Sequence, residues 1–161
     1  MAQLSNATLQ TIEAGQSAIF TTSFITPQEI GIILPNADTS SLYLRGIIPN
    51  RGFLPRFCGC GWRDFFAEFY ASFSANVQIP TGGTVGEISV AIALNGEPLQ
   101  TGTMIVTPTA VETLDNISTQ VFVPIPRGGF GSLSVENTGT EAIEMQNANL
   151  TVFLPGSNFV R

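Results

Sequence analysis

The sequence contains no histidine and no lysine, and charged residues make up only 11% of its 161 residues. Histidine is the commonest general base and a common metal ligand, so its absence excludes Ser-His-Asp and Cys-His catalysis within one chain. All six basic residues are arginines, set against twelve acidic residues and a net charge of −6. A basic face for nucleic acid is therefore not expected. We predict a protein that is not an enzyme, with no catalytic residues, no cofactor and no metal site.

Long hydrophobic runs are also missing. No apolar stretch approaches the roughly 20 residues of a transmembrane helix. The first six residues carry neither the positive charge nor the apolar segment of a signal peptide. We therefore expect no membrane partner. An apolar content of 43% still suffices for one domain with its own core.

Short stretches of alternating apolar residues, separated by many of the 16 glycines and 10 prolines, dominate the chain. This pattern predicts eight or nine strands, and no segment has the periodicity and caps of a helix. The expected strands are Ala18–Ile25, Ile30–Leu34, Leu42–Ile47, Asp64–Ser74, Val85–Leu94, Met104–Thr107, Ile117–Ile125, Phe130–Glu136 and Ala142–Leu154. The fold class that follows is all-β, with two antiparallel sheets in a sandwich or jelly roll.

Three local signals refine this prediction. Asn95-Gly96 is typical of a type I′ hairpin, because both turn positions need a positive φ. Pro124 indicates a strand end or a strand at the edge of a sheet. The apolar register shifts between Met145 and Leu150, as a β-bulge would produce.

The chain divides, by this interpretation, into N-terminal strands with an attachment segment (1–60) and a jelly-roll domain (61–161). The alternative is that the first strands belong to the same sandwich. Residues 49–61 are rich in turn formers and are expected to form a loop.

Aromatic residues are concentrated, with eight of the fifteen between Phe53 and Phe73. Within the strand Asp64–Ser74, Phe65 and Phe69 alternate on one face, while Phe66 and Tyr70 lie on the other. A strand of a sandwich buries one face against the second sheet, so the other apolar face needs a loop or another subunit. We favour the subunit, and predict a homotrimer with Phe65, Phe66, Phe69 and Tyr70 at the contact.

Four of the six arginines, Arg45, Arg51, Arg56 and Arg63, fall in a window without an acidic residue. Arginine binds carboxylates through its planar fork, so this segment is predicted to dock on an acidic partner or on carboxylates of a neighbouring subunit. The alternative is a solvated loop, whose surface ion pairs contribute only about 0–1 kcal/mol each.

Cys58 and Cys60 are separated by one residue. They would form a redox pair or half of a thiolate metal site, but no further Cys or His completes four ligands. We favour two small residues in a tight turn.

The segment Ile79–Leu99, with Met104–Pro108 and Gln146–Val152, resembles the C-terminal domains of collagen-like surface proteins of spore-forming bacteria. This resemblance implies a TNF/C1q-like jelly roll that assembles as a trimer. Similar domains occur in bacteriophage proteins, where they suggest a capsid fibre, spike or decoration role. The chain has no Gly-X-Y collagen repeat, which favours a compact protein on a pre-formed particle.

The expected function is therefore that of a structural virion protein of a bacteriophage. Its expected partners are further copies of itself, other capsid or virion proteins and a host-surface glycan, and its expected location is the virion. The alternative is a surface protein of a bacterial cell or spore, or a receptor- or carbohydrate-binding module that uses loops such as 81–83 and 101–102.

Overall fold

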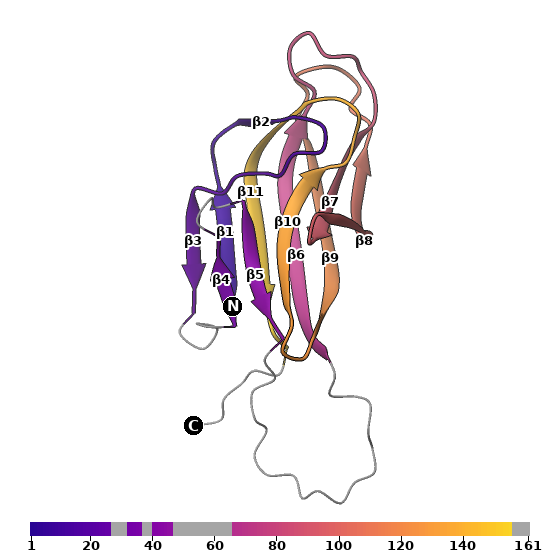
Figure 1. Ribbon diagram of the computed structural model, residues 1–161. Coiled ribbons are helices and arrows are strands. Elements are labelled where there is room, and N and C mark those ends of the chain that lie inside the picture. The colour runs from indigo at the N-terminus through magenta and orange to yellow at the C-terminus, as the bar shows by residue number, and fades with distance from the viewer. Residues whose placement is uncertain (27–31, 37–39, 47–65, 156–161) are drawn as a thin grey trace, which may run out of the picture.

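The computed structural model describes residues 1–26, 32–36, 40–46 and 66–155. These residues form two antiparallel sheets that face each other, and none of them lies in a helix (Figure 1). Sheet A contains β1 (Ala2–Asn6), β2 (Gln10–Ile12), β3 (Thr22–Ile25), β6 (Phe66–Gln78), β9 (Asp115–Pro126) and β11 (Ile143–Phe153). Sheet B contains β4 (Ile33–Pro35), β5 (Ser41–Arg45), β7 (Ile88–Leu94), β8 (Glu97–Val106) and β10 (Phe130–Asn137). The predicted all-β, two-sheet class is confirmed.

Each sheet mixes strands from distant parts of the sequence. The order in sheet A is β3-β1-β11-β6-β9, with β2 also paired to β11, and the order in sheet B is β4-β5-β10-β7-β8. Both sheets therefore contain strands that precede residue 60. The first strand, β1, pairs along its whole length with β11, from Ala2 opposite Val152 to Asn6 opposite Ala148. Within the described ranges, no helix is long and apolar enough to cross a membrane.

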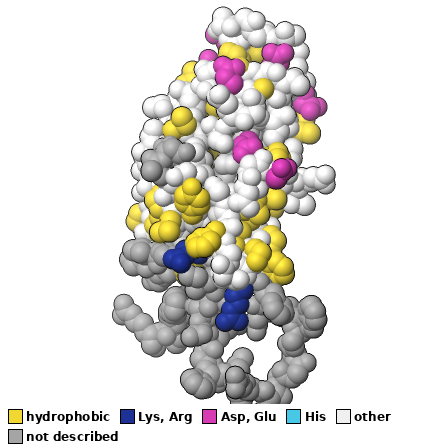
Figure 2. All heavy atoms as spheres, viewed as in Figure 1, with side chains coloured by type: hydrophobic (Ala, Val, Ile, Leu, Met, Phe, Trp, Pro, Cys, Tyr) yellow, Lys and Arg dark blue, Asp and Glu magenta, His cyan; other side chains and the backbone are white. Residues whose placement is uncertain are grey.

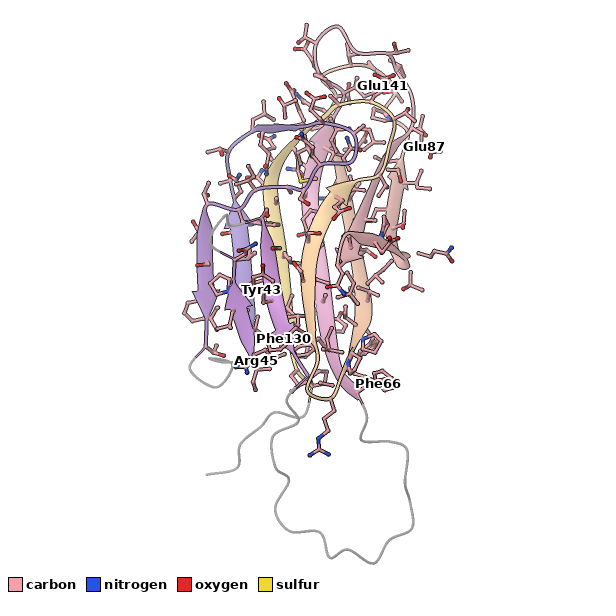
Figure 3. The ribbon with its side chains drawn as sticks, viewed as in Figure 1. Tyr43, Arg45, Phe66, Glu87, Phe130 and Glu141 are labelled. Atoms are coloured by element: carbon pink, nitrogen blue, oxygen red, sulfur yellow. The ribbon has the colours of Figure 1, made fainter. Side chains whose placement is uncertain are left out.

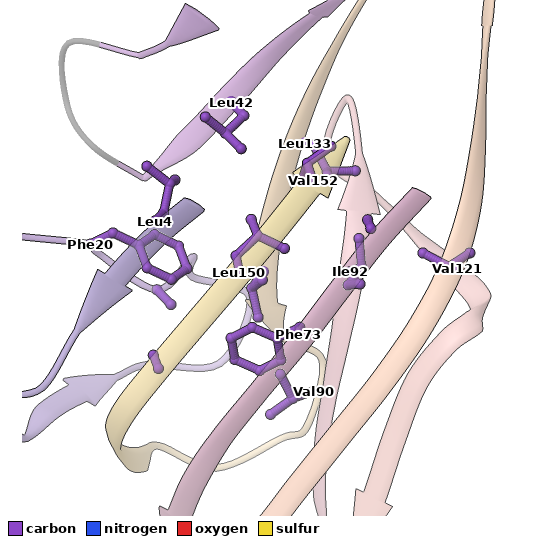
Figure 4. Packing of buried hydrophobic residues seen from close by; sticks show 14 of the residues in the cluster. Leu4, Phe20, Leu42, Phe73, Val90, Ile92, Val121, Leu133, Leu150 and Val152 are labelled. Atoms are coloured by element: carbon purple, nitrogen blue, oxygen red, sulfur yellow. The ribbon is translucent and has the colours of Figure 1, made fainter. Parts of the chain in front are cut away.

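The core lies between the sheets and follows the two-residue period of the strands. On β6, every second side chain from Ala67 to Val77 is buried, and Phe69 and Phe73 have no exposed surface. Figure 4 shows Phe73 and Leu150 of sheet A packing towards Val90 and Ile92 of sheet B. Fully burying a side chain of this size stabilises the fold by about 1.5–3 kcal/mol. Burial of the inward-facing side chains of the long alternating strands is therefore the main contribution to the stability of the fold.

The local predictions at the turns and bulges are confirmed. Asn95 (φ 56°) and Gly96 (φ 79°) join β7 to β8, and the Asn95 carboxamide oxygen accepts a hydrogen bond of 2.8 Å from the Ser132 amide. The pairing of β11 with β6 shifts between Gln146 and Asn149, where Asn147 has a φ of 54°. Pro124 lies in β9, the strand at the edge of sheet A. Proline has no backbone N–H to donate, and an edge strand tolerates this because it has a neighbouring strand on one side only.

Eleven strands are present among the described residues, against the eight or nine expected. The prediction missed β1 and β2 and made β8 too short. The inward position Asn6 of β1 is polar and buried, with its carboxamide donating to the Ile19 carbonyl at 2.8 Å. A hydrogen-bonded asparagine at a core position removes the apolar alternation by which a strand is recognised.

Gly46 holds the chain against the turn between β9 and β10. Its amide donates to the Gly129 carbonyl at 3.0 Å, and the Gly128 amide donates to the Gly46 carbonyl at 3.0 Å. A Cβ atom at Gly46 would overlap the Pro126 carbonyl oxygen. Only glycine permits this close approach of two backbones.

We expect Gly46→Ala to lower the free energy of unfolding by about 1–3 kcal/mol, because the β9–β10 turn must move away. This corresponds to a loss of roughly 5 °C in the thermal midpoint measured by circular dichroism. The matched control is Gly86→Ala, because the nearest atom to its added Cβ is the Thr84 carbonyl oxygen at 3.8 Å. Equal midpoints for the two variants would show that this packing contributes nothing.

Candidate functional site

The outer face of sheet A carries a row of aromatic side chains near the end where β6 begins. Tyr70 of β6 lies opposite Phe122 of β9 on one side and Phe153 of β11 on the other. The Tyr70 and Phe122 rings meet edge to face, with centroids 5.4 Å apart, and the Tyr70 and Phe153 centroids are 4.9 Å apart. Cross-strand aromatic pairs of this kind order the side chains on a sheet surface. We call these three residues, together with Phe66, the aromatic row.

Two of the four rings in the aromatic row are exposed, and the other two, Tyr70 and Phe153, are half-buried. Phe122 is 60% exposed and Phe66 is 52% exposed. Glu68, between Phe66 and Tyr70 on the same face, is the one charged side chain beside the row on β6. An isolated soluble domain seldom leaves a contiguous aromatic surface in water.

Further along the same face the side chains are polar but uncharged. From the row to the pair formed by Asn76 and Asn116, no outward-facing side chain of β1, β6, β9 or β11 carries a charge. The Gln3 carboxamide donates to the Asn149 side-chain oxygen at 3.2 Å, and Asn116 donates to Asn76 at 3.1 Å. Depletion of charge together with aromatic enrichment is the compositional signal of a protein–protein contact.

Two of the four predicted interface residues lie on this face. Phe66 and Tyr70 point outward from β6, as their alternation predicts. Phe69 does not: it is completely buried in the core and has no surface to offer a neighbour, so its assignment to the contact is wrong. Phe65 lies outside the described residues. Phe122 and Phe153 complete the row, and the alternation of Ile117–Ile125 already places Phe122 on the outward face.

Only Arg45 of the four predicted docking arginines is described; Arg51, Arg56 and Arg63 fall outside the described residues. Arg45 ends β5, and its guanidinium carbon lies 5.2 Å from the centroid of the Phe130 ring. Phe130 is opposite Arg45 in the neighbouring strand β10. The arginine thus lies on the outer face of sheet B, across the sandwich from the aromatic row.

Of the two loops suggested for carbohydrate binding, 81–83 and 101–102, only the first lies in a turn. Thr81 lies in the turn after β6, where its hydroxyl donates to a Glu112 carboxylate oxygen at 2.6 Å. Thr101 and Gly102 do not form a loop, because both lie inside β8. The pairing of β8 with β7 shifts between Ala91 and Ala93, and Gly102 packs so close to Ile92 that a Cβ there would be 3.2 Å from the Ile92 Cβ.

Among the residues that the structure describes, no group of three or more His, Cys, Asp or Glu is placed to hold a metal ion. Cys58 and Cys60 lie outside those residues.

No protein-family model matches the chain, and no curated protein matches it. Solved structures do align with it. The chain is similar to the Eiger TNF of S. frugiperda, at TM-score 0.57 and 8% identity, over 96% of this chain and 91% of the other. It is also similar to the globular domain of zebrafish complement 1qA, at TM-score 0.51 and 9% identity, over 96% and 95%.

These alignments define the fold: the chain is a TNF/C1q-like jelly roll. A family 35 carbohydrate-binding module from Clostridium thermocellum aligns at TM-score 0.35 and 8% identity, over 92% and 96%. That likeness is too slight to bear on function. The resemblance to collagen-like spore-surface proteins stays a prediction from the sequence.

Proposed function

We propose that this chain is a structural protein of a bacteriophage particle, a homotrimeric capsid fibre, spike or decoration protein. The observation that carries the proposal is the outer face of sheet A, which is uncharged over most of its length and ends in the exposed aromatic row. In this proposal the face is covered by neighbouring subunits around a threefold axis.

The fold and the chemistry of the face support a trimer together. TNF/C1q-like domains assemble as trimers by the resemblance described above, and this chain has that fold. Three aromatic rows around one axis would bury Phe122, which is 60% exposed in the single chain. Burying apolar surface contributes about 25 cal/mol per Å², so an interface of ordinary size is stable in water. The polar half of the face would supply hydrogen bonds between subunits.

The particle role rests on sequence. The segment Ile79–Leu99 resembles domains of bacteriophage proteins, the chain has no collagen repeat, and it is poor in charge. In this proposal the protein resides on the virion and contacts other capsid proteins, and its fold supplies a rigid projecting module.

We expect light scattering to give a molar mass about three times the 17.1 kDa of one chain at micromolar concentration. Tyr70→Asp should reduce this to the mass of a single chain, because it places an unpaired charge in the contact and costs about 3–5 kcal/mol there. Circular dichroism should show that the variant keeps its strand content, since Tyr70 lies outside the core.

The matched control for this substitution is Leu9→Asp. Leu9 is 51% exposed, comparable with the aromatic row, and it lies between β1 and β2 rather than on the outer face of sheet A. The control should retain the mass of three chains. A wild-type protein that remains monomeric, or a trimer that both variants leave intact, would contradict the proposed contact.

The particle role is tested on phage whose genome encodes this chain. Mass spectrometry of particles purified through a density gradient should detect the chain in stoichiometric amounts, and gold-labelled antibodies should mark the particle in electron micrographs. Detection only in the host envelope or spore coat, with none on the particle, would overturn the virion assignment and leave the trimer unaffected.

A further inference from the structure

The two sheets end in four edge strands, and β3 differs from the other three. The edges are β3 and β9 in sheet A and β4 and β8 in sheet B. Natural proteins place proline or charged side chains on edge strands, because these prevent the edge from pairing with another chain. β9 contains Pro124 and Pro126, β8 contains Pro98, and β4 contains Pro35. β3 (Thr22–Ile25) contains neither a proline nor a charged residue.

β3 is also exposed on both of its faces. It pairs with β1 on one side, and no strand among the described residues pairs with it on the other. Ser23 lies opposite the core residue Leu4 and is nevertheless exposed, so the sandwich does not close over this edge. Phe24, on the outer face of sheet A, is 56% exposed. An uncharged strand with one open edge is a template for a further strand.

The pairing with β1 determines which backbone groups of β3 face the open edge. In an antiparallel ladder, hydrogen-bonded pairs of residues alternate with pairs that are not hydrogen-bonded. The Thr26 amide donates to the Met1 carbonyl at 2.9 Å, so these two residues form a hydrogen-bonded pair just beyond the end of β3. One step along, Ile25 lies opposite Ala2 in a pair without hydrogen bonds, and the alternation continues from there.

Only two residues of β3 therefore present amide and carbonyl groups to the open edge. They are Ser23 and Ile25, whereas the amide and carbonyl of Phe24 point towards β1. The Thr21 amide, just before the strand, already donates to the Ser5 carbonyl at 3.0 Å. Donors and acceptors at every second position are what an added antiparallel strand requires.

These backbone groups are complementary to those of a second β3. When two copies run antiparallel about a twofold axis at Phe24, Ser23 of each copy lies opposite Ile25 of the other, and both residues of both strands are hydrogen-bonded. Moving the axis to Ser23 or to Ile25 leaves one of these residues unpaired in each strand. No like charges meet, because β3 carries none. A second copy therefore fits the open edge in one register.

The same register brings the two Phe24 side chains together. Residues directly opposite each other in a pair without hydrogen bonds have Cα atoms about 4.5 Å apart, so their side chains contact. Each Phe24 ring is 56% exposed in the single chain, and a cross-strand aromatic pair would cover part of both. Figure 2 shows further hydrophobic side chains at the surface on the side of the molecule where β3 lies.

We propose that the open edge of β3 binds β3 of a second copy, so that two copies of sheet A join into one continuous antiparallel sheet. This inference goes beyond the proposed function, because it links assembled units to one another. The contact does not use the aromatic row. β3 and β9 are opposite edges of sheet A, and Figure 3 shows Phe66 on the side of the molecule away from β3.

One pair of four-residue strands is a weak contact on its own. Copies that are already held close together, as in a trimer or on a particle, pair at a much higher effective concentration. The expected role of the β3 edge is therefore to reinforce an array of copies, and its detection in solution calls for a covalent trap.

The test is disulfide trapping at Phe24 in the full chain. Both native cysteines are first replaced, by Cys58→Ser and Cys60→Ser, and Phe24→Cys is then added. The proposed register brings the two new cysteines to a Cα separation at which a disulfide forms. Mild oxidation should therefore give a covalent dimer as the main product on a non-reducing gel.

The matched control is Thr22→Cys in the same background. Thr22 is exposed on the same face of the same strand. In the proposed register it lies opposite Thr26 of the second copy, so the two cysteines are roughly 13 Å apart along the strands. This variant should give less than about a tenth of the dimer obtained with Phe24→Cys, whereas random collisions would give equal amounts.

A substitution at Ser23 tests the edge itself. Lysine is a residue by which natural edge strands avoid pairing, so adding Ser23→Lys to the Phe24→Cys chain should reduce the dimer about fivefold or more. Ser23→Thr, which adds no charge, should leave the dimer in place. Circular dichroism should show the same strand content for both, because Ser23 is exposed.

The trap also separates this inference from the proposed trimer. Adding Tyr70→Asp should leave the Phe24→Cys dimer in place, because the two contacts use different parts of sheet A. Wild-type protein that scatters light as a monomer would contradict the trimer alone. The β3 pairing is overturned if Phe24→Cys gives no more dimer than Thr22→Cys, or if Ser23→Lys leaves the dimer unchanged. Loss of the dimer with Tyr70→Asp would also overturn it, because Phe24 would then belong to the contact of the aromatic row.

Discussion

A strand in a two-layer sandwich has only two faces, and β6 carries large apolar side chains on both. The inner face, with Phe69 and Phe73, is completely buried between the sheets. The outer face presents Phe66 and Tyr70, which the second sheet cannot reach. Because the alternation of side chains is strict, no change of rotamer can move an outward ring into the core. The outer face must therefore be covered by a segment outside the two sheets or by another subunit, or remain in contact with water, and the proposed assembly is the second of these outcomes.

The two strands beside β6, which are β9 and β11, add further aromatic side chains to the outer face of sheet A. The strands on either side contribute Phe122 and Phe153 at the positions directly opposite Tyr70, so the three rings form one continuous row. Above the row the face turns to serine, threonine, asparagine and glutamine without charge. Such a surface costs little to desolvate when its amides and hydroxyls find partners, whereas a charged one would resist burial. The outer face of sheet A thus has the composition of a contact surface, and the proposed trimer would bury it.

Much of the fold could be predicted from the sequence, because the long strands β6, β7, β9 and β11 alternate clearly. Three local features were also predictable, because each depends on the residues at one position. They are the edge position of Pro124, the Asn95-Gly96 hairpin and the bulge in β11. β1 was missed because Asn6, a polar residue, occupies a core position, where its carboxamide oxygen accepts a hydrogen bond of 3.0 Å from the Thr8 amide. Pairing between β1 and β11, at opposite ends of the chain, leaves no local signal.

The candidate site was only half predictable. The two-residue period of a strand puts Phe66 and Tyr70 on one face and Phe69 on the other, and the assignment of Phe69 to the contact ignored that separation. Phe122 and Phe153 are far from the cluster in sequence, and only the register of β9 and β11 against β6 brings them to Tyr70. The stacking of Arg45 on Phe130 likewise depends on the pairing of β5 with β10, which no sequence spacing reports. Alternation predicts which face a residue occupies, whereas register decides which residues on that face meet.

The central claim is that the aromatic row is covered in the assembled protein. Hydroxyl-radical footprinting with mass spectrometry measures this directly, because it labels aromatic side chains according to their exposure to solvent. Phe122 and Phe130 are 60% and 64% exposed in the single chain, so they form a matched pair on opposite sheets. The account predicts that in the purified protein Phe130 is labelled rapidly while Phe122 is protected. Equal labelling of the two rings would show that the outer face of sheet A is open to water and would contradict the account.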